Sequence, residues 1–179
     1  MVVHLSQIKQ ASEKNIFYES TVSLDLKSHI IYNMTMKIVI DTSVVLPALL
    51  SIEGVSNKLM LWLFSNNTKM HVVSNTLVTE YQDVLLREKN RKLYPQFSKD
   101  ELTSFIDDIC LISHHQKINF LWRPFLKDIK DDMILETAFN GNCNYIITYN
   151  LKDFRGVKEK FSIQIVTPKE FLKIVGEIK

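Results

Sequence analysis

Five short runs of apolar residues, separated by longer stretches with helical periodicity, constrain the fold of this chain most strongly. The runs are rich in isoleucine and valine and lack alternating polar residues, which is typical of strands covered on both faces of a parallel sheet. Parallel strands require crossover connections, which are right-handed and usually helical. We therefore predict an α/β fold, with strands at residues 37–40 (KIVI), 70–73 (MHVV), 109–112 (ICLI), 145–148 (YIIT) and 163–166 (IQIV).

Capping residues mark the helices between these strands. A Ser or Thr side chain can accept a hydrogen bond from the first turn, and a Glu three residues later can bond back to the cap. Proline suits the first helical position, and glycine suits the position after the last. These rules predict a helix over 75–87 that Ser74 caps and a helix over 131–140 that Gly141 closes. They also predict capping boxes at Ser98–Glu101 and at Thr167–Glu170, the second with Pro168 in the first turn of its helix.

The chain divides into a short extension and one domain. Its 179 residues, 46% of them apolar, suffice for a single domain with a substantial core. Residues 1–33 contain scattered apolar residues, no Gly or Pro, and charges that cancel. We interpret residues 1–33 as an N-terminal extension and 34–179 as the domain. A start codon assigned too early, before Met34 or Met36, gives the same pattern.

Composition limits the cellular compartment and the binding partners to be expected for this chain. The chain has two cysteines, Cys110 and Cys143, outside any CxxC spacing, so neither a disulfide framework nor a zinc site is expected. Charged residues interrupt the first twenty positions, and no later apolar run approaches the roughly 20 residues that span a bilayer. A cytoplasmic protein without a membrane segment is therefore expected. The net charge of +2 neither requires nor excludes nucleic acid.

Five acidic residues stand at positions that the predicted fold brings together. Asp41 follows the first strand, Asp153 lies in the loop after the fourth, Asp131 and Asp132 begin a helix, and Glu80 lies early in another. In open parallel sheets, functional groups gather beyond the carboxyl ends of the strands. Clustered carboxylates repel one another unless hard cations such as Mg²⁺ or Mn²⁺ neutralise them. The pattern therefore predicts metal-dependent chemistry.

Each of these acids also has a purely structural interpretation. Asp41 suits the cap of a helix beginning near Ser43, and acids in the first turn of a helix gain from its dipole, as Asp131 and Asp132 would. Glu80 suits an ordinary solvated helix position, and Asp153 suits an Asx turn. The adjacent His114 and His115 are expected to be exposed or capping rather than catalytic, because adjacent strand residues point to opposite faces.

Together these segments resemble the PIN domain family, the fold of many metal-dependent ribonucleases and of VapC-like toxins. The resemblance covers residues 36–179 in order and is closest to PIN domains described as toxin components of toxin–antitoxin pairs. It is carried by IVIDTSVVLPALL at 38–50, VSNTLVTEYQDVL at 73–85, KDDMILETAFNGNCNYIITYNLKDF at 130–154, and IQIVTPKEFL.

The resemblance implies an α/β/α sandwich with a mostly parallel central sheet of about five strands. It also implies an endoribonuclease that uses Mg²⁺ or Mn²⁺, a small antitoxin as partner, and a homodimer. Spacing to the YIIT strand favours Asp132 over its neighbour as the third acid, and some relatives carry an aspartate in place of Asn150. The implied acids are Asp41, Glu80, Asp132 and Asp153, with Asp131 adjacent and Ser43, Thr148 and Asn150 as small polar residues around them.

An RNA substrate requires positive groups beside the acids. The candidates are Arg87, Lys89, Arg91 and Lys92, together with Arg123, whose neighbour Trp122 could stack on a base or belong to the core. The alternative function is a PIN-like module that binds RNA or protein without cleavage. A haloacid-dehalogenase-like phosphatase is excluded, because it needs an aspartate where Ser43 stands. A response-regulator receiver is excluded too, because neither MHVVS nor ICLIS, the predicted strands that would carry its phosphorylated aspartate, ends in one.

Overall fold

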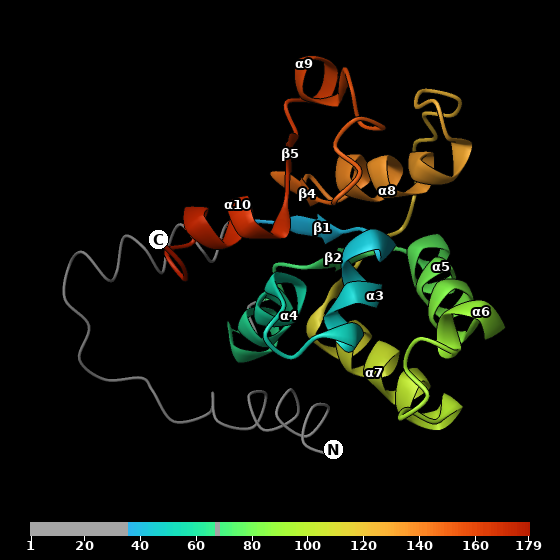
Figure 1. The fold of residues 1–179 in the computed structure, drawn as a ribbon. Helices are drawn as coiled ribbons and strands as arrows, with labels where there is room; N and C mark the ends of the chain where they lie inside the picture. Colours follow the sequence, from blue (N-terminus) through green and yellow to red (C-terminus); the bar gives the residue numbers. More distant parts are fainter. Residues whose placement is uncertain (1–35, 67–68) are drawn as a thin grey trace.

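The computed structural model describes residues 36–66 and 69–179, so the predicted extension at 1–33 lies outside the described residues. One to three helices separate each strand from the next along the described chain (Figure 1). The strands are β1 (Ile38–Ile40), β2 (Val72–Val73), β3 (His114–His115), β4 (Tyr145–Ile147) and β5 (Gln164–Val166). The helices are α3 (Thr42–Leu50), α4 (Val55–Asn66), α5 (Asn75–Leu86), α6 (Glu88–Arg91), α7 (Lys99–Ile112), α8 (Ile129–Asn140), α9 (Val157–Phe161) and α10 (Pro168–Ile174).

The strand pairs in the described residues are all parallel. One ladder has the order β1-β4-β5, with Ile40 opposite Ile147 and Ile147 opposite Val166. A second ladder pairs β2 with β3, and a parallel bridge between Ile38 and His71 joins the two ladders. The spatial order is therefore β3-β2-β1-β4-β5. The predicted α/β class and parallel sheet are confirmed, although the larger ladder has three strands rather than about five.

The strand predicted at residues 109–112 (ICLI) is wrong, because this segment is the last turn of α7. The capping box at Ser98 starts an amphipathic helix whose buried residues recur every three or four positions through Ile109 and Ile112. Leu111 is 76% exposed, as the helical period requires. The strand begins only at His114, whose N–H donates to the carbonyl of His71 at 2.7 Å.

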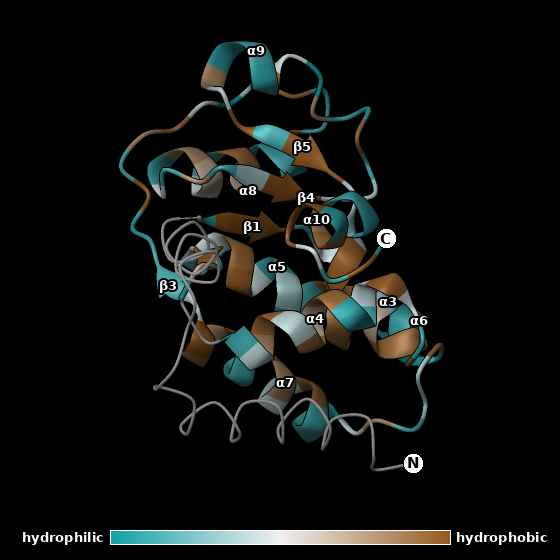
Figure 2. Cartoon of the chain, turned by 90° about the vertical axis from the view of Figure 1, so that its left-hand side faces the viewer, coloured by the Kyte–Doolittle hydropathy of each residue, from teal (hydrophilic) through white to brown (hydrophobic). Residues whose placement is uncertain are grey.

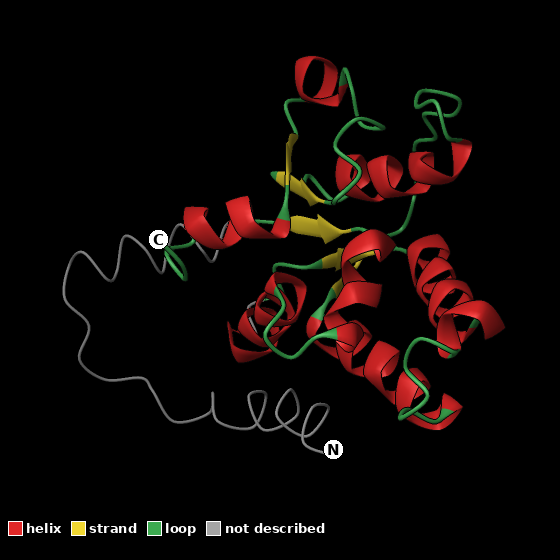
Figure 3. Ribbon diagram, in the orientation of Figure 1, coloured by secondary structure: helices red, strands yellow, loops and turns green. Residues whose placement is uncertain are grey.

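Both faces of the sheet are covered. Successive strand residues point to opposite faces, yet all three residues of β1 are fully buried. Helix α8 packs against β1, β2 and β4, while α10 packs against β5 and α4. In Figure 2, hydrophobic residues gather on β1 and β4, and the outer helix α9 is largely hydrophilic. The strands thus lie between layers of helices, as Figure 3 also shows.

Three of the predicted helix starts are confirmed. Ser74 caps α5, and the boxes at Ser98–Glu101 and Thr167–Glu170 both form, with Pro168 in the first turn of α10. Gly141 follows α8, where a Cβ atom would lie 2.8 Å from Cγ1 of Val72, so the close approach of this helix end to β2 requires glycine. Helix α8 begins two residues earlier than predicted, capped by Asp128.

No single helix in the described residues has the length and apolar composition to cross a membrane. Helices α3 and α4 pass that test only as a pair, and a bend of 101° separates them.

Candidate active site

Asp41 is the centre of a dense set of hydrogen bonds where β1 ends. The backbone N–H of Asp41 donates to the carbonyl of Ile147 at 2.9 Å, which places Asp41 beside the end of β4. Its carboxylate accepts from the Ser43 hydroxyl at 2.6 Å and from the Thr148 hydroxyl at 2.5 Å. It also accepts from the Ser43 N–H at 3.2 Å and thereby caps α3. The capping and site interpretations of Asp41 are thus compatible, and its carboxylate is held in one orientation.

The loop after β4 folds over this carboxylate. The Tyr149 N–H donates to the Ser43 hydroxyl at 3.2 Å, and the Asn150 N–H donates to the Thr148 hydroxyl at 2.9 Å. The Asp153 N–H then donates to the carbonyl of Asn150 at 2.9 Å. The loop therefore turns back, and half-buried Asp153 lines a cavity of about 380 Å³ with Lys127 and Asp128.

The first turn of α8 adds further carboxylates to the same region. Asp128 caps the helix by accepting from the Lys130 N–H at 3.0 Å. Burial, as the largest cause, and the neighbouring charges of Asp41, Asp128, Asp153 and Asp132 together raise the pKa of Asp131 to about 7. The structure therefore brings acids from β1, α8 and the loop after β4 within electrostatic reach of one another, with Asp131 among them.

Asp132 faces a different environment from its neighbour. It is fully buried and accepts from the Leu126 N–H at 2.8 Å and from the Phe125 N–H at 3.3 Å. Consecutive helix residues point about 100° apart, so the two aspartates cannot share one direction. Sequence spacing favours Asp132 as the third acid, whereas the hydrogen bonds of Asp132 and the charges around Asp131 favour Asp131.

Asp132 belongs to a row of polar residues on α8 that binds residues 119–126, which we call the strap. Asp132, Glu136 and Asn140 are spaced four apart and so lie on one face of the helix. The Glu136 carboxylate accepts from the Trp122 N–H at 3.0 Å, and the Asn140 side-chain oxygen accepts from the Phe120 N–H at 2.9 Å. The strap continues directly into Lys127 and Asp128. The row of polar residues on α8 therefore holds in place the segment that leads to the acidic cavity.

Two residues considered for RNA contacts are occupied within the strap. The Arg123 guanidinium donates to both oxygens of buried Glu136, at 3.0 and 2.7 Å. The Trp122 ring packs edge-on against Phe139 and Phe161, with centroids 5.1 and 4.9 Å apart. Trp122 therefore belongs to an aromatic cluster, and Arg123 serves as the counter-ion of Glu136.

The other basic candidates lie around α6. Lys92 pairs with Glu88 at 4.0 Å across exposed surface, and Arg91 is half-buried. Arg87 lines an open hollow of about 580 Å³ together with three α5 residues, one of them Asp83. Arg87 and Lys89 are exposed. These groups remain proposed RNA contacts.

Glu80 lies half-buried on α5, and it is not among the charges that shift the pKa of Asp131. The next residue ties this helix to the site, because the fully buried Tyr81 hydroxyl donates to the carbonyl of Ile40, directly before Asp41. The Tyr81 ring stacks on His71, and burial lowers the pKa of His71 to about 3, so this imidazole is neutral. Tyr81 therefore anchors α5 beside Asp41. In the sequence, Tyr81 can be recognised only as one apolar position of the predicted helix.

Removal of this anchor gives a direct test. We expect Tyr81→Phe to lower the free energy of unfolding by about 1–3 kcal/mol, because the buried Ile40 carbonyl loses its hydroxyl donor. Urea denaturation measures this change. The buried Tyr94→Phe variant is a matched control, because its hydroxyl donates to the Leu85 carbonyl at the far end of α5. If only Tyr81→Phe changes the response of stability to Mn²⁺, the Tyr81 anchor acts on the site as well as on the fold.

His114 and His115 are both exposed, as the sequence predicts. His115 Nε2 lies 3.1 Å from the carbonyl of Cys110, at the end of α7. Both cysteines are free thiols, so the predicted absence of a disulfide agrees with the structure in the described residues.

The described side chains do not form a complete metal cage. Within residues 36–66 and 69–179, no group of three or more His, Cys, Asp or Glu side chains has an arrangement that could hold a metal ion. What the structure does provide is a set of oxygen donors with mutual repulsion, at the carboxyl edge of parallel strands.

The fold and this edge define an α/β protein with a carboxylate-rich site beyond its parallel strands, the usual location of function in such sheets. Among known protein families, the PIN domain matches residues 37–152, so the chain belongs to the PIN domain family. PIN domains are generally nucleases. A comparison with curated proteins gives no match.

Proposed function

We propose that this protein is a divalent-metal-dependent endoribonuclease that hydrolyses RNA phosphodiester bonds. The observation that carries the proposal is the gathering of Asp41, Asp131 and Asp153 at one edge of the sheet. Burial raises the pKa of Asp131 there, and the charges of the neighbouring carboxylates add to this rise, so these groups repel one another. Such repulsion is costly to a fold unless a cation relieves it. Carboxylate oxygens are the ligands that Mg²⁺ and Mn²⁺ prefer.

The residues present fit such a cation by chemistry and charge. Asp41, Asp131 and Asp153 would hold it, with Glu80 contributed from α5 and Asn150 as a neutral oxygen donor. A bound Mg²⁺ or Mn²⁺ lowers the pKa of a coordinated water and stabilises charge that develops on the phosphate.

The chain's own residues orient this set. The hydroxyls of Ser43 and Thr148 donate to Asp41 and hold its carboxylate in one orientation. Asp132 holds the strap through the N–H groups of Phe125 and Leu126 and thereby supports the first turn of α8. We therefore assign binding to Asp131 and positioning to Asp132.

The biological role proposed is that of the toxin in a toxin–antitoxin pair, acting in the cytoplasm. The resemblance in sequence supports this role, together with a homodimer and a small antitoxin. An antitoxin Arg or Lys directed at the acids would neutralise the same carboxylates that a cation would, because both supply positive charge.

The nuclease proposal is tested by incubating tRNA, rRNA and single-stranded RNA with the full-length protein in Mn²⁺, Mg²⁺ or EDTA. We expect metal-dependent cleavage, and we expect Asp41→Asn to reduce its rate by at least about 100-fold, because a ligand and its hydroxyl partners are affected together. The matched control is Asp107→Asn, which removes the charge of an exposed α7 carboxylate outside the site. RNA binding without cleavage in any metal would favour the alternative, a non-catalytic PIN-like binding module.

A further inference from the structure

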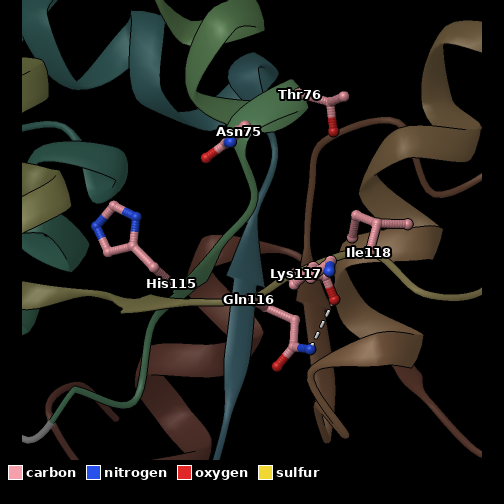
Figure 4. A pocket seen from close by; sticks show the side chains of 6 residues that line it. All are labelled: Asn75, Thr76, His115, Gln116, Lys117 and Ile118. Carbon is pink, nitrogen blue, oxygen red and sulfur yellow. Dashed lines mark hydrogen bonds between the residues drawn. The ribbon is translucent and has the colours of Figure 1, made fainter.

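A second cavity lies at the same edge of the sheet as the acids, beyond β2 and β3. Its volume is about 420 Å³, which is within the range of small-ligand pockets. Asn75 and Thr76 stand on one side of it, and the segment 116–118 stands on the other (Figure 4). The Gln116 N–H donates to the carbonyl of Val73 at 2.8 Å and so fixes that segment beside β2.

The lining of this cavity suits a nucleotide. Lys117 provides a positive charge, and no described acid lies within ion-pair distance of it. Asn75 provides an amide donor and acceptor, and Ile118 provides an apolar surface. The Gln116 side-chain amide donates one N–H to the carbonyl of Lys117 at 2.8 Å (Figure 4), which leaves its oxygen and its second N–H for a ligand. The His115 ring points away from these groups (Figure 4). None of the described Asp or Glu residues lines this cavity, whereas Asp128 and Asp153 line the cavity of about 380 Å³.

The sheet order places this cavity close to Asp41. Neighbouring strands lie about 4.8 Å apart, so the end of β3 is roughly 10 Å from the end of β1. Thr76 and Glu80 lie four residues apart on α5 and therefore share one face, about 6 Å apart along the axis. A nucleic acid strand that crosses the carboxyl edge therefore meets the cavity and the acids in succession.

We propose that this cavity binds a nucleotide of single-stranded RNA next to the bond that is cleaved. Lys117 pairs with a phosphate, and Asn75 and Gln116 bond to the edges of a base. This subsite rests on the proposed function, since it serves the same RNA strand. It also provides the positive charge that a polyanion needs beside an acidic centre, a role that Arg123 cannot fill while it is paired with Glu136.

The test measures the affinity of full-length protein for a fluorescein-labelled oligouridine of about ten nucleotides, at several salt concentrations. Asp41→Asn is the background, so that the RNA stays intact in Mn²⁺. We expect Lys117→Ala to weaken binding several-fold and to lower the salt slope of log Kd by about one, as loss of one phosphate contact requires. Lys69→Ala is the matched control, since Lys69 is exposed at the opposite end of β2.

The proposed subsite is wrong if the affinity for RNA does not depend on Lys117. If Lys117→Ala and Lys69→Ala give equal affinities and equal salt slopes while the wild-type protein cleaves RNA, the subsite is wrong and the proposed nuclease stands. If the Asp41→Asn protein shows no affinity for the oligouridine and the wild-type protein cleaves no RNA, both proposals are wrong.

Discussion

Asp131→Asn is expected to raise the melting temperature of the metal-free protein at pH 8 and, in the same molecule, to reduce RNA cleavage by at least about 100-fold. The substitution removes a charge that burial and the charges of Asp41, Asp128, Asp153 and Asp132 all disfavour. Relief of about 1 kcal/mol would raise the melting temperature by about 2–4 °C in a chain of this size. A stabilising change that abolishes activity is the signature of a strained functional carboxylate.

The pH dependence follows from the same shift. The pKa of Asp131 lies at about 7 in the folded chain and near its ordinary value of 3.8 when unfolded. Between these values the folded state binds more protons, so the contribution of Asp131 to stability is fully present at low pH and is lost as the pH rises through 7. Wild-type stability should therefore fall relative to Asp131→Asn between pH 5 and pH 8.

Thermal unfolding in EDTA, with and without excess Mn²⁺, measures both effects. Mn²⁺ should raise the melting temperature of the wild type more than that of Asp131→Asn, because only the wild type has the repulsion to be relieved. Asp107→Asn, which removes an exposed charge on α7, should behave as the wild type does. A lower melting temperature for Asp131→Asn at pH 8 in EDTA would show that the carboxylate stabilises the fold and is not strained.

Local signals in the sequence predicted the parts of the structure that short-range physics determines. Ser74, Ser98 and Thr167 cap their helices because the hydroxyl and the N–H that it accepts from lie within one turn. The rule that parallel strands end at one edge predicted that Asp41 lies where the YIIT strand also ends, and the Asp41 N–H does donate to the carbonyl of Ile147 there. At these positions, the structure that the local sequence favours is also the structure that tertiary packing favours.

The sequence misled at one apolar run and gave no sign of contacts between distant segments. The run at 109–112 is apolar enough for a strand, but the capping box at Ser98 starts a helix that continues through it. Which of two adjacent aspartates faces the other acids depends on the rotation of α8 about its axis. The strap sets that rotation by binding Asp132 and Glu136, and the sequence gives no local sign of those bonds. The pairing of Arg123 with Glu136 was unpredictable for the same reason.

Asp132→Ala is expected to have the opposite effect on stability from Asp131→Asn. The N–H groups of Phe125 and Leu126 lose their acceptor inside the protein, at a cost of about 2 kcal/mol. The melting temperature should fall by about 4–8 °C. This loss should persist in Mn²⁺, because it arises from hydrogen bonds to the backbone, which a bound cation does not replace.

Limited proteolysis shows where that energy is lost. Release of the strap should expose the backbone near Phe125 to cleavage in Asp132→Ala, and Asp131→Ala, which alters the same helical turn without touching the strap, should leave it protected. If both alanine variants lose stability equally and both strengthen with Mn²⁺ as the wild type does, neither carboxylate is dedicated to the strap. If only Asp132→Ala releases the strap, the two neighbouring aspartates have different roles. Asp132 then holds the segment that leads to the site, and Asp131 supplies charge within the site.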